Sequence, residues 1–260
     1  MAAKAGPLRL AVGATWVLLL GLTLLNLGDG LQATLLGVRA SLEKFPTTAT
    51  GILMSAFYVG FLVGSILTPG LVAKVGHVRV FGALASLASA AILIHALFVS
   101  PWTWSALRLI SGFCFAGLYI VAESWLNERA TNETRGQLLS IYMLVSYGGL
   151  ALGQLLLNLA DPTGHVLFVL VSVLISLALV PLLLSAGQAP DFTSTATLRL
   201  RDLYRLSPLG VIGTAAAGMS AAILFSMGPV YGEAIGLSVR DISFLMTAAV
   251  VGCVVLQWPI

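Results

Sequence analysis

Charged residues are scarce in this sequence. Only 9% of its 260 residues are Asp, Glu, Lys or Arg, whereas about one-quarter of a soluble domain is charged. Hydrophobic residues make up 58% of the chain, and the mean hydropathy is +1.01. A soluble fold of this length lacks the interior volume to hide so much apolar surface. The composition therefore excludes an ordinary soluble domain and indicates a protein whose outer side chains contact lipid.

Cysteine and excess positive charge are limited as well. Cys114 and Cys253 each lie in an apolar run, so we interpret them as packed hydrophobic residues rather than a disulfide or a metal site. The 13 basic and 10 acidic residues give a net charge of +3, which does not predict nucleic-acid binding. The three histidines are dispersed, and the sequence has no HExxH, GxSxG or P-loop pattern. We therefore expect no enzymatic activity, no metal, no cofactor and no ATP-driven step.

Long apolar runs dominate the rest of the sequence. Eight of them can cross the roughly 30 Å hydrocarbon layer as helices; they cover about 8–36, 50–72, 78–99, 104–125, 137–159, 166–184, 209–231 and 244–260. The runs are continuous rather than alternating, which excludes a membrane β-barrel. The first run has a basic start like a signal peptide, but it is about twice as long as a signal core, so we predict a retained helix. The fold class is an all-α membrane protein.

The basic residues are unevenly divided between the two sides of the membrane. With a cytoplasmic N-terminus, nine of them fall in cytoplasmic segments and three in outer segments. The cytoplasmic nine are Lys4, Arg9, Lys74, Arg79, Arg129, Arg135, Arg199, Arg201 and Arg205, and the outer three are Arg39, Lys44 and Arg240. Because Lys and Arg tend to stay on the cytoplasmic side, we predict that the N-terminus is cytoplasmic.

A polar segment divides the spans into six and two. Residues 185–207 are rich in Ser and Thr and become basic towards their end, a composition that cannot form a packed core. We predict three regions: a six-helix bundle at 1–184, a cytoplasmic linker at 185–207, and the first two helices of a second bundle at 208–260. Within the linker, 198–206 fits a short amphipathic helix on the membrane surface, and Ser238-Val-Arg-Asp241 has the form of a capping box at the start of the last span.

Three local motifs carry a family resemblance. Gly70-Leu-Val-Ala-Lys-Val-Gly76-His-Val-Arg79 stands between the second and third spans, Arg108-Leu-Ile-Ser-Gly112 lies in the fourth, and Gly148-Gly-Leu-Ala-Leu-Gly153 in the fifth. Their order and sidedness resemble those of the major facilitator superfamily, especially a poorly characterised bacterial branch. The first motif departs from the family pattern, because Ala73 replaces its usual aspartate and Pro69 its first glycine.

The resemblance implies a fold and an activity. It implies a complete six-helix N-terminal bundle, with the third and sixth helices peripheral, and the first two helices of a C-terminal bundle. It also implies a proton-coupled secondary transporter of a small solute, working by alternating access in the bacterial inner membrane and monomeric when full length. Since the chain stops at Ile260, directly beside an apolar run and without a polar tail, we expect a C-terminally truncated fragment.

The first span has a polar face. Thr23, Asn26, Asp29 and Gln32 follow one another at intervals of three residues, so neighbouring members lie on one side of a helix. We predict that Asn26, Asp29 and Gln32 line a substrate or proton pathway. The glycines on either side of Asp29 would permit a local break in the helix. The alternative is that Asp29 caps a shortened helix at the outer interface.

The fourth span places Arg108, Gly112, Tyr119 and Glu123 on one face. A lone guanidinium is costly in a membrane, so Arg108 needs a partner or water, unless it snorkels to the outer surface. Arg108 and Asp29 have similar predicted depths. We therefore hypothesise a charge pair between them that binds a charged substrate or releases a proton, with Tyr119 on the same pathway.

Two further groups complete the predicted site. Tyr142 shares a face of the fifth span with small residues and is a secondary cavity candidate. At the cytoplasmic end, we predict a gate in which Glu123 pairs with Arg79 or Arg129 near the turn at Gly76. The simpler alternative is that Arg79 only holds its loop against anionic lipid.

Three classes of function compete for this sequence. Secondary transport of a small-molecule substrate is favoured by the resemblance and by the charges within the spans. A non-transporting membrane receptor or assembly partner is the alternative. A membrane enzyme would require clustered His, Asp or Glu, which the sequence lacks.

Overall fold

The chain folds into long helices. The computed structural model describes residues 7–184 and 200–257, and these contain helices and connections but no strand. The elements are α1 (Pro7–Leu42), α2 (Thr47–Val75), α3 (His77–Leu97), α4 (Pro101–Arg129), α5 (Arg135–Leu155), the 3₁₀ helix η1 (Leu156–Leu159), α6 (Val166–Leu184), α7 (Leu200–Leu206), α8 (Pro208–Ala234) and α9 (Val239–Gln257). Eight described helices are long and apolar enough to cross a membrane, which confirms the predicted all-α membrane fold.

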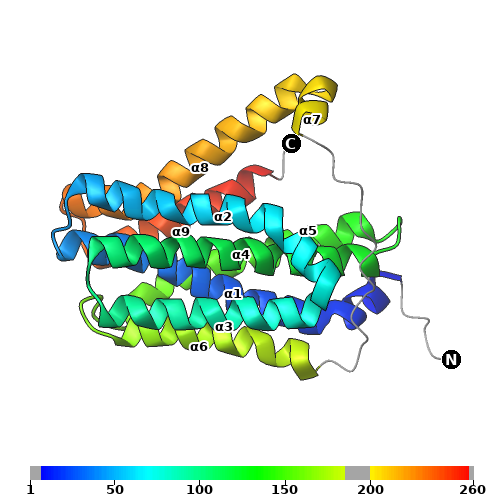
Figure 1. Cartoon of the computed structure of the whole chain (residues 1–260), viewed down its shortest axis with the longest axis horizontal. Helices are drawn as coiled ribbons and strands as arrows, with labels where there is room; N and C mark the ends of the chain where they lie inside the picture. Colours follow the sequence, from blue (N-terminus) through cyan, green and yellow to red (C-terminus); the bar gives the residue numbers. More distant parts are fainter. Residues whose placement is uncertain (1–6, 185–199, 258–260) are drawn as a thin grey trace.

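The first six long helices form a bundle whose axes run roughly together (Figure 1). We call the end with Gly76 and residues 130–134 the proximal end, and the end with residues 43–46, 98–100, 160–165 and 235–238 the distal end. Helices α3 and α6 lie together on the side away from α8, which agrees with their predicted peripheral position. Helix α9 packs along α5, whereas α8 touches α1 near the distal end and then diverges from the bundle.

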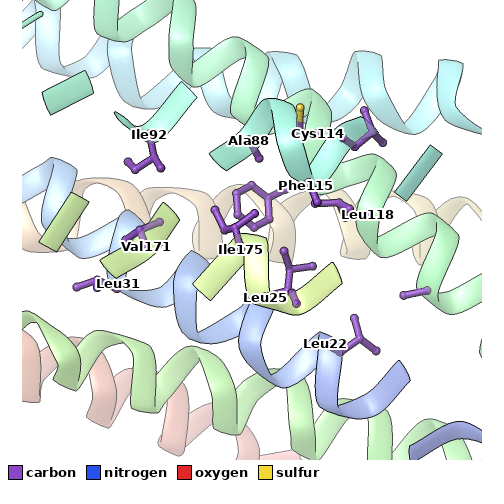
Figure 2. Packing of buried hydrophobic residues seen from close by; sticks show 14 of the residues in the cluster. Leu22, Leu25, Leu31, Ala88, Ile92, Cys114, Phe115, Leu118, Val171 and Ile175 are labelled. Atoms are coloured by element: carbon purple, nitrogen blue, oxygen red, sulfur yellow. The ribbon is translucent and has the colours of Figure 1, made fainter. Parts of the chain in front are cut away.

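The apolar core of the bundle lies among α1, α3, α4 and α6. Figure 2 shows Phe115 of α4 directed against Ile175 of α6, with Leu25 of α1 beside them. Phe115 and Ile175 are completely buried. Cys114 is also fully buried in this cluster and Cys253 is exposed, and neither forms a disulfide. Cys114 is thus a packed hydrophobic residue, as predicted.

Glycines bring helix backbones into direct contact inside the bundle. A Cβ atom added at Gly60 of α2 would collide with the carbonyl oxygen of Leu109 in α4, and one added at Gly112 of α4 would collide with that of Phe57 in α2. The same relation joins α1 to α5, where a Cβ at Gly153 would strike the Leu27 carbonyl. The small-residue positions of α2 and α5 are therefore packing positions, as small residues in membrane helices commonly are.

Helix α1 is continuous from Pro7 to Leu42. Neither a local break beside Asp29 nor an early end of the helix at Asp29 occurs. The flanking glycines serve packing instead, since Gly28 faces Ile175 of α6 and Gly30 lies against the Leu150 carbonyl of α5. Close approach of neighbouring helices accounts for both glycines, so the break that they would permit is not formed.

Two connections follow the sequence predictions closely. Gly76 alone separates α2 from α3, with φ 86° and ψ 160°, a backbone conformation that favours glycine. At the start of α9, the Ser238 hydroxyl accepts a hydrogen bond from the Asp241 N–H (3.2 Å) and donates one to Asp241 Oδ2 (2.6 Å). Helix α7 lies inside the predicted amphipathic segment, whose residues 198 and 199 fall outside the described residues.

Candidate functional site

A cavity of about 130 Å³ lies where α8 meets the bundle. Five helices contribute to its wall. The lining residues are Asp29 and Ala33 of α1, Phe57 and Tyr58 of α2, Arg108 of α4, Leu150 and Gln154 of α5, and Phe225 and Ser226 of α8. All are within about 13 residues of the distal end of their helices, or roughly 20 Å at 1.5 Å per residue. The cavity therefore lies in the distal half of the bundle.

Asp29 is held by a hydroxyl group from α4. Tyr119 Oη lies 2.8 Å from Asp29 Oδ2 and 3.1 Å from Asn26 Oδ1, within donor distance of both. Asn26 is buried, and its Nδ2 donates to the Leu22 carbonyl at 2.8 Å. The single hydroxyl proton of Tyr119 can be donated to either oxygen, so Tyr119 links α4 to Asn26 and Asp29 of α1. These three predicted residues form one hydrogen-bonded group.

Arg108 reaches the same cavity from α4. Only 4% of its surface is exposed, which rules out snorkelling to the outer surface. Its guanidinium carbon lies 4.2 Å from the centre of the Phe57 ring, a cation–π arrangement. Within the described residues its Nε has no hydrogen-bond partner, and no carboxylate oxygen lies within 4 Å of the guanidinium. Arg108 and Asp29 thus share a cavity without direct contact.

Gln154 is a lining residue that the sequence reasoning missed. It is 1% exposed, and neither its Oε1 nor its Nε2 has a partner among the described residues. A buried amide without hydrogen bonds is costly, so we expect Gln154 to find a hydrogen-bond partner in a bound ligand or another conformation. The available signal was an amide directly after Gly153, at the close approach of α5 to α1.

Among the described residues, the α8 side of the cavity has no polar side chain without a hydrogen-bond partner. Ser226 Oγ donates to the carbonyl of Ala222, one turn earlier in α8, at 2.5 Å. Tyr58 Oη of α2 donates to the same carbonyl at 3.3 Å. Both hydroxyls are therefore engaged, and one carbonyl links α2 to α8 at the edge of the cavity.

Other predicted residues lie away from this cavity. Gln32 is 1% exposed, and its side-chain amide has no hydrogen-bond partner in the described residues, but it is not part of the cavity wall. Tyr142 donates a hydrogen bond to Glu123 Oε1 at 2.7 Å, which joins α5 to α4 closer to the proximal end. Two residues of the predicted gate lie at the proximal end: Gly76 between α2 and α3, and Arg79 in the first turn of α3.

Glu123 does not contact its predicted ion-pair partners in the described part of this structure. Its carboxylate receives the Tyr142 hydroxyl, and within the described residues it forms no ion pair with Arg79 or Arg129. Arg129 is half-buried and has interactions of its own. The gate role of these residues stays a prediction.

A multi-helix membrane protein with charged residues facing an internal cavity is typical of the transport proteins. The sequence profile of the Major Facilitator Superfamily matches residues 10–260. The chain belongs to this family.

Curated relatives and a solved structure agree with that assignment. The chain is 32% identical over 246 residues to the uncharacterized MFS-type transporter YcaD of Escherichia fergusonii, and 31% identical over 247 residues to YcaD of Escherichia coli K12. Each match covers 94% of this chain but 64% of the relative. The crystal structure of the nucleoside transporter NupG superposes with a TM-score of 0.72 at 14% identity, covering 95% of this chain and 67% of that one. This likeness supports the fold.

Proposed function

We propose that this chain belongs to a secondary active transporter that moves a small solute by alternating access, coupled to protons. The observation that carries the proposal is the cavity between the bundle and α8, which contains Asp29 and Arg108. A charge within a membrane span costs about 2.5–3.5 kcal/mol on insertion scales, so such residues usually serve transport or a proton relay. Membership of the family and the transporters among its relatives support the same conclusion.

The proposal also assigns the two membrane sides of the protein and its two helix bundles. The proximal end, which holds Lys74, Arg79, Arg129 and Arg135, is cytoplasmic, because basic residues favour that side. The two bundles comprise residues 1–184 and 208–260, joined by 185–207. Rocking of one against the other exposes the cavity alternately, and Glu123 with Arg79 or Arg129 closes the cytoplasmic side in the opposite state. The transporter acts as a monomer.

Proton flux into liposomes tests the proposal. The full-length protein is reconstituted with a pH-sensitive dye inside, and single compounds are added: sugars, nucleosides, amino acids and aromatic carboxylates. At least one compound is expected to drive proton movement, and Asp29→Asn and Arg108→Gln should each reduce it at least about tenfold, because each removes a charged group of the cavity.

Matched variants control for the loss of charge alone. Asp161→Asn changes an exposed aspartate in a connection, and Arg240→Gln removes a guanidinium that also lies over a phenyl ring, that of Phe244 at 5.6 Å, but is exposed at the distal end. Both should keep the flux. If neither cavity variant alters uptake, efflux or pH dependence, the proposal is wrong. Compound binding without any flux would favour a receptor.

A further inference from the structure

The free hydrogen-bonding capacity of the cavity is mostly donor capacity. Arg108 presents a planar fork of five N–H groups, and none of them is paired with a carboxylate among the described residues. Its aromatic neighbour Phe57 covers one face of the guanidinium plane, which leaves the N–H edge as the polar contact available to a ligand. A fork of this kind fits the two oxygens of a carboxylate.

Gln154 adds a second unpaired group from a different helix. Its amide is as deeply buried as any polar side chain of the cavity and contributes two N–H donors and one acceptor. Among the described residues, the Gln154 amide and the Arg108 Nε are buried without a hydrogen-bond partner. Each carries a penalty that a bound ligand with oxygen acceptors would remove. Their joint presence in one wall points to the same ligand.

The remaining polar groups of the wall are largely satisfied. Tyr58 and Ser226 donate to Ala222, and Asp29 accepts from Tyr119. Asp29 still contributes a negative charge, so the cavity contains one charge of each sign. A cationic ligand would have Asp29 to bind but would leave the donors of Arg108 and Gln154 unmet, whereas an anionic ligand satisfies both donors. The donor excess therefore favours the anion.

The rest of the cavity wall is mostly apolar, and the cavity is small. Phe57, Phe225, Leu150 and Ala33 contribute carbon surface. The volume of about 130 Å³ is close to that of apolar cavities of about 150 Å³ that bind benzene. A ligand of this size has one ring or a short branched chain in addition to its polar group.

We propose that the cavity binds a small monocarboxylate with an apolar or aromatic body. Arg108 binds the carboxylate, Gln154 donates a second hydrogen bond to it, and the aromatic side chains surround the body. This assignment rests on the proposed function, because it names the class of solute that the transporter would carry. Benzoate represents this class by size and charge, and benzamide and benzylamine are its neutral and cationic counterparts.

Calorimetric titration of the purified full-length protein in lipid nanodiscs tests the assignment. At neutral pH, benzoate should bind, benzamide should bind at least about tenfold more weakly, and benzylamine should not bind. Arg108→Gln should weaken benzoate binding by roughly tenfold to a hundredfold, in line with the strength of hydrogen bonds to charged groups. Gln154→Leu should weaken it by a smaller factor.

The sign of the Asp29 effect separates the two possible ligand charges. Asp29→Asn should strengthen benzoate binding, because it removes a negative charge from the cavity, whereas a site for cations would lose affinity. Thr68→Val is the matched control: Thr68 is fully buried on α2, and its hydroxyl has no partner in the described part of the chain, but it does not line the cavity. This nearly isosteric change should leave benzoate affinity unchanged.

Several results would overturn the assignment. These are equal or tighter binding of benzylamine or benzamide, unchanged benzoate affinity in Arg108→Gln, or no binding of benzoate at all. If Arg108→Gln does not fold, Arg108→Lys replaces it, and retention of full affinity there would contradict the role of the fork. Benzoate binding without proton flux would leave the assignment standing and count against the transporter proposal.

Discussion

The six-helix bundle and the α8–α9 pair are packed in different ways. Inside the bundle, glycines such as Gly60, Gly112 and Gly153 set one helix backbone directly against a carbonyl oxygen of another. In the pair, a Cβ atom added at Gly228 would lie 2.8 Å from the sulfur of Met246, and one added at Gly232 would lie 2.9 Å from Cγ1 of Ile242. A backbone carbonyl cannot move out of the way, whereas a methionine side chain changes rotamer readily. The bundle is therefore the stiffer region.

Polar side chains contribute to the contacts between the two regions. Hydroxyl and amide groups join them: Tyr58 to the Ala222 carbonyl, Asn158 to Ser243 at 2.7 Å, and Thr247 to the Ala151 carbonyl at 3.3 Å. These bonds can be exchanged for other partners, while backbone-to-backbone packing cannot. The comparison locates adaptability at the interface and in the pair, next to the cavity.

The largest effect is expected from one methyl group inside the bundle. Gly60→Ala should lower the free energy of unfolding by roughly 1–3 kcal/mol or more, since overpacking here displaces two backbones. Gly228→Ala should cost less than about 1 kcal/mol, because Met246 can repack. Unfolding of both variants in lipid nanodiscs, followed by tryptophan fluorescence, measures the difference.

A third glycine provides a control for Gly60→Ala and Gly228→Ala. Gly148 of α5 has open space where a Cβ would lie, so Gly148→Ala should stabilise by up to about 1 kcal/mol through helix propensity. If Gly60→Ala proved as mild as Gly228→Ala, backbone contact would not distinguish the two regions.

A medium effect is expected at the helix ends, where the two regions also differ. The N-caps of α2 to α5 make no side-chain hydrogen bond, whereas Ser207 and Ser238 accept from backbone N–H groups at the starts of α8 and α9. Ser238→Ala should cost about 1 kcal/mol, and hydrogen exchange should increase in the first turn of α9. Ser100→Ala at the start of α4 is the matched control and should change neither quantity; equal effects would remove this contrast.

The smallest effect is expected in the connection between η1 and α6. The Thr163 N–H donates to Asp161 Oδ1 at 2.8 Å, which holds the pKa of Asp161 below its usual value of 3.8. A carboxyl whose pKa is lower in the folded state stabilises the fold above its unfolded pKa and loses that contribution as the pH falls through the folded value. Asp161→Ala should therefore lower the midpoint temperature of thermal unfolding slightly at pH 7 and less at pH 3. A larger difference at pH 3 would contradict this sign.

The sequence predicted the helices well because each span is specified locally. Continuous apolar runs, the positive-φ position at Gly76 and the cap at Ser238 all act within a few residues. The sequence did not determine whether α1 is interrupted at Asp29, because glycine permits both a bend and close packing, and only the neighbouring helices decide between them. Gly28 and Gly30 meet α6 and α5, which no pattern within α1 reveals.

The cavity was predictable only in part. Intramembrane charge drew attention to Asp29 and Arg108, and the structure places both in one wall. Gln154, Phe57 and Phe225 come from helices whose mutual positions depend on tertiary packing. The expected direct pair of Asp29 with Arg108 rested on equal depth along the membrane axis. Depth does not determine lateral distance, and Tyr119 is the hydrogen-bond partner of Asp29 instead.

The carbonyl oxygen of Ala222 accepts two hydrogen bonds, one from Tyr58 of α2 and one from Ser226 of α8. This lowers the free-energy cost of moving α2 away from α8 beside the cavity. When Tyr58 withdraws with α2, the Ala222 oxygen still holds the shorter bond from Ser226 within its own helix. No acceptor is then orphaned in a medium without water, which is the usual penalty for parting two helices in a membrane. Tyr58 lines the cavity, so its hydroxyl can bind a solute or a water in the cavity after it leaves the Ala222 carbonyl.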